Sequence, residues 1–369
     1  MKILELTNYS AGIDGVFARV KQESILLAQK GHEVRIFSSN FEKGTDKIVP
    51  ANDKINGVYI ERFPAKKLGG ESFLSWNFKS EALKFKPDVI IAHSYRHQHT
   101  KKALKIAKEI GAKVFLVTHA PFERGETRTL PQKLIVWLYD KIVGRSTLNK
   151  FDKIIAITMW EIPYLLSLGV KKENIVYIPN GINSIFLRQK KALEKNKILF
   201  LGRIAPIKSL ETLLEAIPLI KDKSLKVEIV GPAEADYLNK LKNLIKEKNL
   251  GKRVIFSPAI YDIKQKIKKI DSAKIFVLPS KSEGMPQSLV EAMAREKIVI
   301  AANNPASHDL IKDGKNGYLF EIGNEKSLAS KINLSLAGNQ KRIRKKARKS
   351  IEKFSWDKII EKLSALISS

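Results

Sequence analysis

The sequence predicts an α/β protein made of two doubly wound, Rossmann-like domains that face a central cleft. Short apolar runs alternate with helix-forming stretches in two separate series, a pattern typical of parallel sheets with helices on both faces. A polar, lysine-rich segment over 188–197 separates the two series, and 369 residues exceed what one ordinary core needs. We therefore expect an N-terminal domain over 1–185 and a C-terminal domain over 186–353.

The N-terminal series begins with a buried strand at Ile3–Leu6, a loop through Gly12 and Gly15, and a helix over Val20–Gln29 that Gly31 ends. The same order then recurs along the chain. The further expected elements are strands at Val34–Phe37, Val89–Ala92, Val114–Val117, Lys153–Ile157 and Ile175–Ile178, and helices at Thr100–Ile110 and just before Gly169.

The C-terminal series repeats this alternation. Its expected strands are Ile198–Leu201, Val227–Val230, Val254–Phe256, Ile275–Leu278 and Ile298–Ala301, with a helix around Leu210–Ile220. Ligands of open parallel sheets bind beyond the carboxyl ends of the strands. The residues that follow each strand are therefore the candidates for a functional site.

Composition limits the classes of function. Without cysteine the chain has no disulfide and no thiolate nucleophile, and its six histidines lack metal-site spacing, so we expect no metal centre. No apolar run reaches the roughly 18 to 20 residues of a spanning helix. Glu5 also interrupts the first apolar run, where a signal peptide needs an unbroken apolar stretch, so we expect a cytoplasmic protein. The net charge of +29, densest at 341–349, indicates either a solvated lysine-rich face or an anionic surface partner.

Charged residues follow several strands of the second series. Arg203 and Lys208 lie five residues apart across a strand-to-helix turn, so both cations can converge on one anion, and a diphosphate suits them. Glu283 and Glu291 flank the start of a helix that Pro286 favours, and paired carboxylates accept hydrogen bonds from vicinal hydroxyls. The alternative interpretation of both pairs is ordinary surface charge near helix ends.

Three segments carry a resemblance to a known family. Leu201–Lys208, Ser282–Ala294 and Ile178–Asn183 resemble family 4 glycosyltransferases, retaining enzymes of GT-B architecture, and the likeness extends from the Gly15 loop to Phe354–Trp356. The resemblance implies that Arg203 and Lys208 hold a donor diphosphate. It also implies that the helix over 354–369 packs back on the N-terminal domain.

The same resemblance assigns the remaining site residues. It implies that Glu291 binds ribose, that Glu283 approaches the donor sugar, that His119 lies near that sugar, and that Gly15 brings backbone close to the phosphate. The predicted catalytic residues are His119, Glu283, Arg203 and Lys208. Further predicted donor-binding residues are Gly202, Gly231, Ala259, Ile260, Gly284, Met285, Pro286 and Leu289. His93, which also ends a strand, fits a structural or a functional role.

Three positions depart from the family pattern. Asp14, Ser209 and Glu296 stand where the family commonly has glycine. Asp14 places a negative charge beside the expected diphosphate site. Glu296 lies beyond the motif, where it is expected to alter a helix end.

The resemblance implies a retaining transfer of a hexosyl unit from a UDP- or GDP-linked sugar to a glycan or lipid-linked acceptor. Because two cations can replace a divalent ion at the diphosphate, and no Asp-x-Asp motif is present, we expect metal-independent activity without a cofactor. A nucleotide-sugar epimerase of the same architecture and a non-catalytic polyanion-binding protein are the alternatives. No nucleic-acid motif is found, so no specific nucleic-acid partner is expected.

Basic and apolar loops of the N-terminal half suggest where an acceptor binds. Lys66–Gly70, Phe73, Trp76 and Arg124–Arg128 combine cations with large apolar side chains. Such loops suit the anionic inner face of a membrane. We therefore hypothesise a peripheral contact of this half with a membrane.

Overall fold

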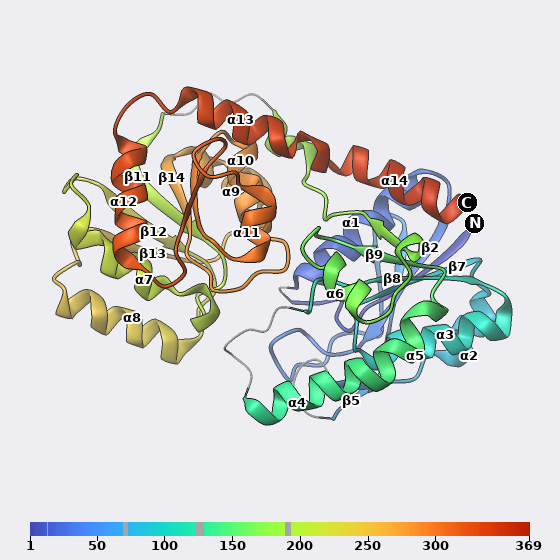
Figure 1. Cartoon of the computed structure of the whole chain (residues 1–369). Helices are drawn as coiled ribbons and strands as arrows, with labels where there is room; N and C mark the ends of the chain where they lie inside the picture. The colour runs from blue at the N-terminus through green and yellow to red at the C-terminus, as the bar shows by residue number, and fades with distance from the viewer. Residues whose placement is uncertain (13, 69–72, 123–128, 189–192) are drawn as a thin grey trace. The chain divides into compact units, whose positions relative to one another are not determined.

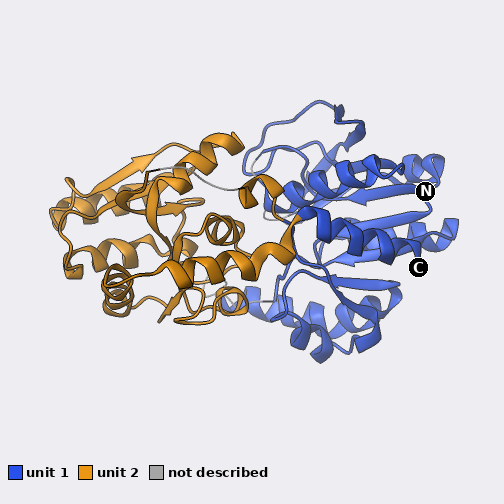
Figure 2. Cartoon of the chain, turned by 90° about the horizontal axis from the view of Figure 1, so that it is seen from above, with its two compact units in different colours: residues 1–181, 356–369 blue, residues 182–355 orange. Residues whose placement is uncertain are grey.

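The chain forms two compact units, coloured separately in Figure 2. The computed structural model describes residues 1–12, 14–68, 73–122, 129–188 and 193–369. The first unit joins residues 1–181 to residues 356–369, and the second comprises residues 182–355. The chain therefore passes between the units at Gly181–Ile182 and at Ser355–Trp356.

Unit 1 is built on an eight-stranded sheet of order β10-β9-β8-β7-β1-β2-β4-β3. All neighbouring strands are parallel except β3 and β4, which form an antiparallel hairpin at the edge. The strands are β1 (Lys2–Leu6), β2 (Glu33–Ser39), β3 (Asn52–Ile55), β4 (Val58–Phe63), β7 (Val89–His93), β8 (Lys113–Val117), β9 (Lys153–Ala156) and β10 (Ile175–Tyr177). The central strands are almost entirely apolar and buried because helices cover both of their faces.

The helices of unit 1 lie around this sheet, as Figure 1 shows. They are α1 (Gly15–Gln29), α2 (Lys79–Phe85), α3 (Gln98–Ile110), α4 (Leu130–Tyr139), α5 (Arg145–Thr147), α6 (Ile162–Ser167) and α14 (Trp356–Ser368), with the π-helical turn η1 (Asp140–Gly144) and the 3-10 turns η2 (Leu148–Lys150) and η3 (Lys172–Asn174). Among the described residues, no helix has both the length and the apolar character that crossing a bilayer requires.

A small hairpin of unit 1 corrects one prediction about the surface. β5 (Ala65–Lys67) pairs with β6 (Leu74–Trp76), and Trp76 is buried against Phe63 and Phe78, with ring centroids 5.9 and 4.5 Å away. Trp76 is therefore a core residue and cannot contact a membrane. Phe73 is exposed as expected, whereas Gly69, Gly70 and Arg124–Arg128 lie outside the described residues.

Unit 2 is built on a six-stranded, fully parallel sheet of order β13-β12-β11-β14-β15-β16. Its strands are β11 (Lys195–Leu201), β12 (Lys226–Val230), β13 (Val254–Ser257), β14 (Ala273–Leu278), β15 (Ile298–Ala302) and β16 (Tyr318–Phe320). Its helices are α7 (Leu210–Ala216), α8 (Ala235–Glu247), α9 (Ile263–Asp271), α10 (Gln287–Ala294), α11 (Pro305–Leu310), α12 (Glu325–Leu336) and α13 (Lys341–Ile351), and its 3-10 turns are η4 (Ser184–Leu187), η5 (Pro206–Lys208), η6 (Ile217–Leu219) and η7 (Glu352–Phe354). Both units thus have the predicted Rossmann-like, doubly wound form.

The C-terminal helix α14 belongs to unit 1 and packs on α1. Lys30 at the end of α1 donates to Glu361 at 2.6 Å. The Trp356 ring lies over Gly181, where an added Cβ would come within 2.3 Å of a ring carbon. Glycine at this position therefore allows the close packing of the Pro179-Asn180-Gly181 segment on α14.

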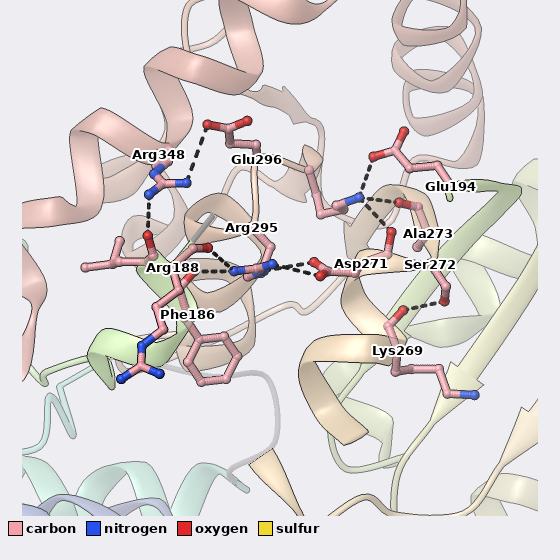
Figure 3. A network of polar contacts seen from close by, with 12 residues as sticks. Phe186, Arg188, Glu194, Lys269, Asp271, Ser272, Ala273, Arg295, Glu296 and Arg348 are labelled. Carbon is pink, nitrogen blue, oxygen red and sulfur yellow. Dashed lines mark hydrogen bonds and ion pairs between the residues drawn. The ribbon is translucent and has the colours of Figure 1, made fainter. Parts of the chain in front are cut away.

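A buried ionic network fixes the first residues of unit 2 (Figure 3). Arg295 forms a two-point ion pair with Asp271, both contacts being 2.8 Å, and donates to the carbonyl oxygens of Phe186 and Arg188. Because buried charges are costly without partners, this pairing holds the segment in one place.

The linker expected over 188–197 is too long, since β11 already begins at Lys195.

Candidate functional site

The loops after β11, β12 and β14 meet at one edge of the unit 2 sheet. Gly202 N donates to Val230 O at 3.0 Å, and Lys281 N donates to Ile207 O at 2.9 Å. A Cβ added to Gly231, whose φ is +151°, would lie 1.9 Å from Gly202 O. Only glycine therefore fits at position 231, and the predicted Gly202 and Gly231 loops lie in direct contact.

The two predicted phosphate-binding cations are each paired with a carboxylate. Arg203 Nη1 lies 2.8 Å from Glu234 Oε1, and both side chains are about half exposed. Lys208 Nζ lies 2.6 Å from Glu283 Oε1, and this pair is largely buried. The structure thus brings Lys208 and Glu283 together, as the spacing of the motifs predicts for one site.

Glu291 lies on α10, the helix that follows this loop, and its side chain is mostly buried. Lys266 of α9 donates to Glu291 Oε1 at 2.6 Å. Burial raises the pKa of Glu291, and the Lys266 ammonium partly offsets this rise. Lys266 is a cation at this edge that sequence reasoning missed, because nothing in the α9 pattern distinguishes it from the neighbouring lysines.

The other predicted donor-binding residues of unit 2 lie on the same loops with different exposure. Ala259 and Ile260 follow β13 and are partly exposed, as are Gly284 and Met285 in the loop before α10. Pro286 is buried at the start of α10. Leu289 is fully buried in the core of unit 2, so its side chain supports α10 and is not available to a ligand.

In unit 1, Gly15 is the first residue of α1, and Asp14 caps this helix. The Asp14 carboxylate accepts a hydrogen bond from Val16 N at 3.1 Å. Among the described residues nothing lies within 4 Å of a Cβ built on Gly15, and its φ is not in the left-handed region. Packing and backbone strain therefore do not require glycine here, which fits a requirement imposed by a ligand.

His119 follows β8 in a strained segment. Its φ is +60° and that of Ala120 is +50°, and in the neighbouring loop after β7 Ser94 and Arg96 also have positive φ. Such strain in residues other than glycine is concentrated at functional sites. The carboxyl ends of β7 and β8 are therefore the strongest candidate for function within unit 1.

A buried chain of polar side chains connects His119 to the base of α1. His93 Nδ1 lies 3.0 Å from His119 Nε2, while His93 Nε2 lies 2.7 Å from Glu5 Oε2 and 3.1 Å from Glu23 Oε1. Arg19 Nε donates to Glu23 at 3.0 Å. One possible metal-ligand atom from each of Glu5, Glu23 and His93 lies within 4.8 Å of the other two, a spacing that also suits a metal ion. Arg19, however, already supplies a positive charge beside Glu23.

These contacts determine the protonation of both histidines. Burial opposes a charge on His93, but hydrogen bonds to Glu23 and Glu5 outweigh it and raise the pKa of His93 to about 9. Burial, with repulsion from His93 and Arg19, lowers the pKa of His119 well below its usual value. At neutral pH the doubly protonated His93 therefore donates to Nε2 of a neutral His119, which leaves His119 with a proton on Nδ1.

Glu5, Glu23 and Arg19 are the members of this chain that sequence reasoning missed. Glu5 is the fourth residue of the first strand, between two buried leucines, where an isolated carboxylate is unfavourable. That position was the sign in the sequence that Glu5 has a buried partner. Burial and the nearby Glu23 raise the pKa of Glu5 to about 7. Arg19 also donates to the carbonyl oxygen of Ile178 and to Asn180, so it links α1 to the Pro179-Asn180-Gly181 segment.

The departures from glycine at Ser209 and Glu296 both have a conformational cost. Their φ values are +48° and +54°, in the region that favours glycine. Ser209 compensates through a hydroxyl contact with Thr212 at 3.0 Å. Glu296 follows Arg295, the C-cap residue of α10, and lies 3.7 Å from Arg348, so it alters the end of this helix and not the loops of the site.

We expect the stability of unit 1 to fall as the pH rises from 7 to 9. Folded His93 keeps its proton to a pKa of about 9, against 6.5 in the unfolded chain, so its stabilisation is complete below pH 6.5 and is lost through pH 9. At about 1.4 kcal/mol per pKa unit, roughly 2 kcal/mol should disappear over this interval. Urea unfolding at both pH values measures the loss. His93→Gln should flatten the dependence, and an equal slope in that variant contradicts the assignment.

Comparison with known proteins places these features in one family. The family description "Glycosyltransferase Family 4" matches residues 13–184, and "Glycosyl transferases group 1" matches residues 183–350. The two matches follow one another along nearly the whole chain. The chain belongs to the family 4 glycosyltransferases. Its two Rossmann-like units are those of the GT-B fold.

Individual relatives of this family 4 glycosyltransferase agree with that assignment. The poly(ribitol-phosphate) alpha-N-acetylglucosaminyltransferase of Staphylococcus aureus (strain COL) is 30% identical over 246 residues, covering 64% of this chain and 46% of the relative. The chain matches 46% to 64% of the length of three curated relatives.

Solved structures show the same fold at low sequence identity. Sucrose-phosphate synthase from Thermosynechococcus elongatus superimposes with a TM-score of 0.82 at 19% identity, covering 100% of this chain and 98% of that chain. Anabaena HepE in complex with UDP and glucose gives a TM-score of 0.77 at 18% identity, covering 100% and 99%.

Proposed function

We propose that this family 4 glycosyltransferase transfers a hexosyl unit, with retention, from a UDP- or GDP-linked sugar to a glycan or lipid-linked acceptor. The observation that carries the proposal is the largely buried Lys208–Glu283 pair on adjoining loops beside the Gly202–Gly231 contact. A cation for the departing diphosphate and a carboxylate for sugar hydroxyls are the two groups that the transfer requires. The net charge of +29 favours an acceptor held at an anionic surface.

The two ion pairs suggest how a donor engages these loops. A diphosphate carries more charge than one carboxylate, so it competes with Glu283 for Lys208 and with Glu234 for Arg203. Glu283, once released, becomes an acceptor for donor hydroxyls. Donor binding would thus convert two internal ion pairs into contacts with the leaving group and the sugar.

The resemblance to retaining family 4 enzymes implies the following bond changes. The bond from the anomeric carbon to the diphosphate oxygen breaks, and the acceptor oxygen bonds to the same face of that carbon. The acceptor proton passes to an oxygen of the departing diphosphate, so no protein nucleophile is needed. Arg203 and Lys208 stabilise the leaving charge, and neutral His119 donates from Nδ1 to the donor sugar.

Activity should not require a divalent metal, because Arg203 and Lys208 supply two positive charges at the diphosphate. We expect turnover in excess EDTA to stay within about twofold of the untreated rate, since charge stabilisation of this kind depends on the protein's own donors. Assays with and without added magnesium or manganese measure this. A chelator-induced loss that these ions restore contradicts the prediction.

The donor class can be identified before any acceptor is known. A ligand that binds only the folded state raises the melting temperature, and an excess of about 100-fold over Kd adds about 2.7 kcal/mol. We expect stabilisation by UDP or GDP and by their hexose conjugates, but not by ADP. A panel of the three diphosphates and their sugars in thermal-shift measurements tests this. Equal, negligible shifts throughout the panel would contradict donor binding.

A further inference from the structure

Helix α4 and the turn η1 form an exposed apolar surface that the proposed transfer does not use. Among the described residues, twenty large apolar side chains are exposed, and six of them fall between residues 130 and 142. No residue of α4 is buried. These six side chains, which we call the α4 surface, are Leu130, Leu134, Ile135, Trp137, Leu138 and Ile142.

The side chains of the α4 surface are exposed although they lie close together in the sequence. Their exposed fractions range from 41% at Leu138 to 80% at Leu130. Leu130, Leu134 and Leu138 recur every four residues and so follow one stripe of the helix. Contiguous apolar surface of this kind marks a site of association.

The C-terminal end of this helical stretch is firmly anchored to unit 1. Arg96 makes a two-point ion pair with Asp140, at 2.8 and 2.6 Å, and Tyr95 donates to the same carboxylate at 3.1 Å. Gly144 leaves room for the Tyr95 hydroxyl, because an added Cβ would lie 2.2 Å from it. Figure 1 shows α4 and α5 following one another along the outside of unit 1. The exposed side chains are therefore held by a fixed support.

The charges around the α4 surface indicate its partner. Between residues 129 and 150 the sequence has four cations, Lys133, Lys141, Arg145 and Lys150, and one carboxylate, Asp140, which Arg96 already neutralises. Lys141 Nζ lies 4.1 Å from the centre of the Trp137 ring. Long cationic side chains beside exposed leucine and tryptophan are the arrangement that binds an anionic bilayer interface.

A cavity of about 570 Å³ adjoins the helix, and its wall also combines cationic and apolar side chains. Lys133, Lys141 and Arg145 line it together with Arg96, and Trp137 and Tyr164 form apolar parts of its wall. A cavity with cationic and aromatic walls suits a phosphate-bearing headgroup above its acyl chains. A second copy of this chain would instead bring two basic surfaces together, which is unfavourable.

We infer that the α4 surface docks this chain on an anionic lipid bilayer, with Leu134, Trp137 and Leu138 entering the interface and Lys133 and Lys141 contacting headgroups. This contact differs from the loop hypothesis of the sequence, since Trp76 is buried and α4 takes its place. It does not depend on the identity of the donor or the acceptor.

Flotation of the whole protein with phosphatidylcholine vesicles, with and without phosphatidylglycerol, tests this inference. We expect binding only to the vesicles that contain phosphatidylglycerol, and a shift of tryptophan emission to shorter wavelength as Trp137 leaves water. Leu134→Ser/Leu138→Ser should lower the partition coefficient at least about tenfold. The matched control Leu219→Ser/Leu334→Ser, which changes exposed leucines of unit 2, should bind like the parent protein.

A matched pair of double variants tests how much the lysine charges contribute to vesicle binding. Lys133→Gln/Lys141→Gln should weaken binding severalfold and reduce its dependence on salt, whereas Lys240→Gln/Lys242→Gln on α8 should not. Circular dichroism and donor stabilisation are measured on each variant, so that misfolding and failure of the proposed transfer are recognised separately. Three outcomes overturn the inference: equal binding to neutral vesicles, unchanged binding of the α4 variants, and a dimer of the parent protein that Leu134→Ser/Leu138→Ser abolishes.

Discussion

Replacing Arg203 and Lys208 together with glutamine is expected to lower kcat/KM at least about 10³-fold. Each side chain offers a charge-assisted hydrogen bond worth about 1.5 to 3 kcal/mol, and leaving-group charge grows in the transition state. Loss of both removes the positive charge that a departing diphosphate needs. Release of nucleoside diphosphate from the donor identified by thermal shift measures the effect.

A control of equal charge separates this effect from the general field of a +29 protein. Lys240→Gln/Lys242→Gln removes the same two charges from exposed positions of the same unit and should leave kcat/KM within about twofold. Because Glu283 loses its contact with Lys208 in the double variant, the folding of that variant is checked by circular dichroism. Equal losses in both variants would mean that the site charges have no special role.

His119→Asn is expected to lower kcat about 10²- to 10³-fold while the affinity for nucleoside diphosphate changes little. Removal of one positioned hydrogen-bond donor to a charged transition state costs about this much. Asparagine is chosen because the φ of +60° at this position disfavours most other residues. Steady-state kinetics with separate determination of kcat and KM test the prediction.

The control for His119 lies in the same strained segment. Ala120→Gly relieves a φ of +50° without removing a polar group, and its kcat should stay within about threefold of the parent value. A value of kcat in His119→Asn that matches the parent enzyme would show that His119 only maintains the loop.

The sequence predicted the two Rossmann-like units because their strands are buried on both faces and therefore appear as short apolar runs. The hairpin of β3 and β4 was missed, although Asn56-Gly57, with both φ values positive, is a recognised hairpin turn. Its strands, Asn52–Ile55 and Val58–Phe63, carry charged residues and lack a continuous apolar run. An edge strand exposed to water loses the signal on which the other elements depended.

The candidate site was predictable where its residues lie in loops that follow the strands of one parallel sheet, because the carboxyl ends of such strands share one edge. Lys208 and Glu283 meet because they lie in the loops after β11 and β14, which are neighbouring strands of this sheet. The pairing of Glu291 with Lys266, and of His93 with Glu5 and Glu23, involves side chains within helices and strands, whose partners depend on tertiary packing that the sequence pattern does not specify. Trp76 was misplaced for the same reason, since its burial depends on tertiary packing against Phe63 of β4 and Phe78.

Isothermal titration of UDP and UMP, or of GDP and GMP if the panel selects guanine, into the parent protein and Arg203→Gln/Lys208→Gln tests the phosphate-binding role most directly. The two cations are assigned to the diphosphate, and a monophosphate lacks one of its two phosphates, so the double substitution should weaken the diphosphate at least about 10²-fold and the monophosphate much less. The preference for the diphosphate should then nearly disappear. An unchanged ratio of the two dissociation constants would contradict the account, because the carrier would then be held elsewhere.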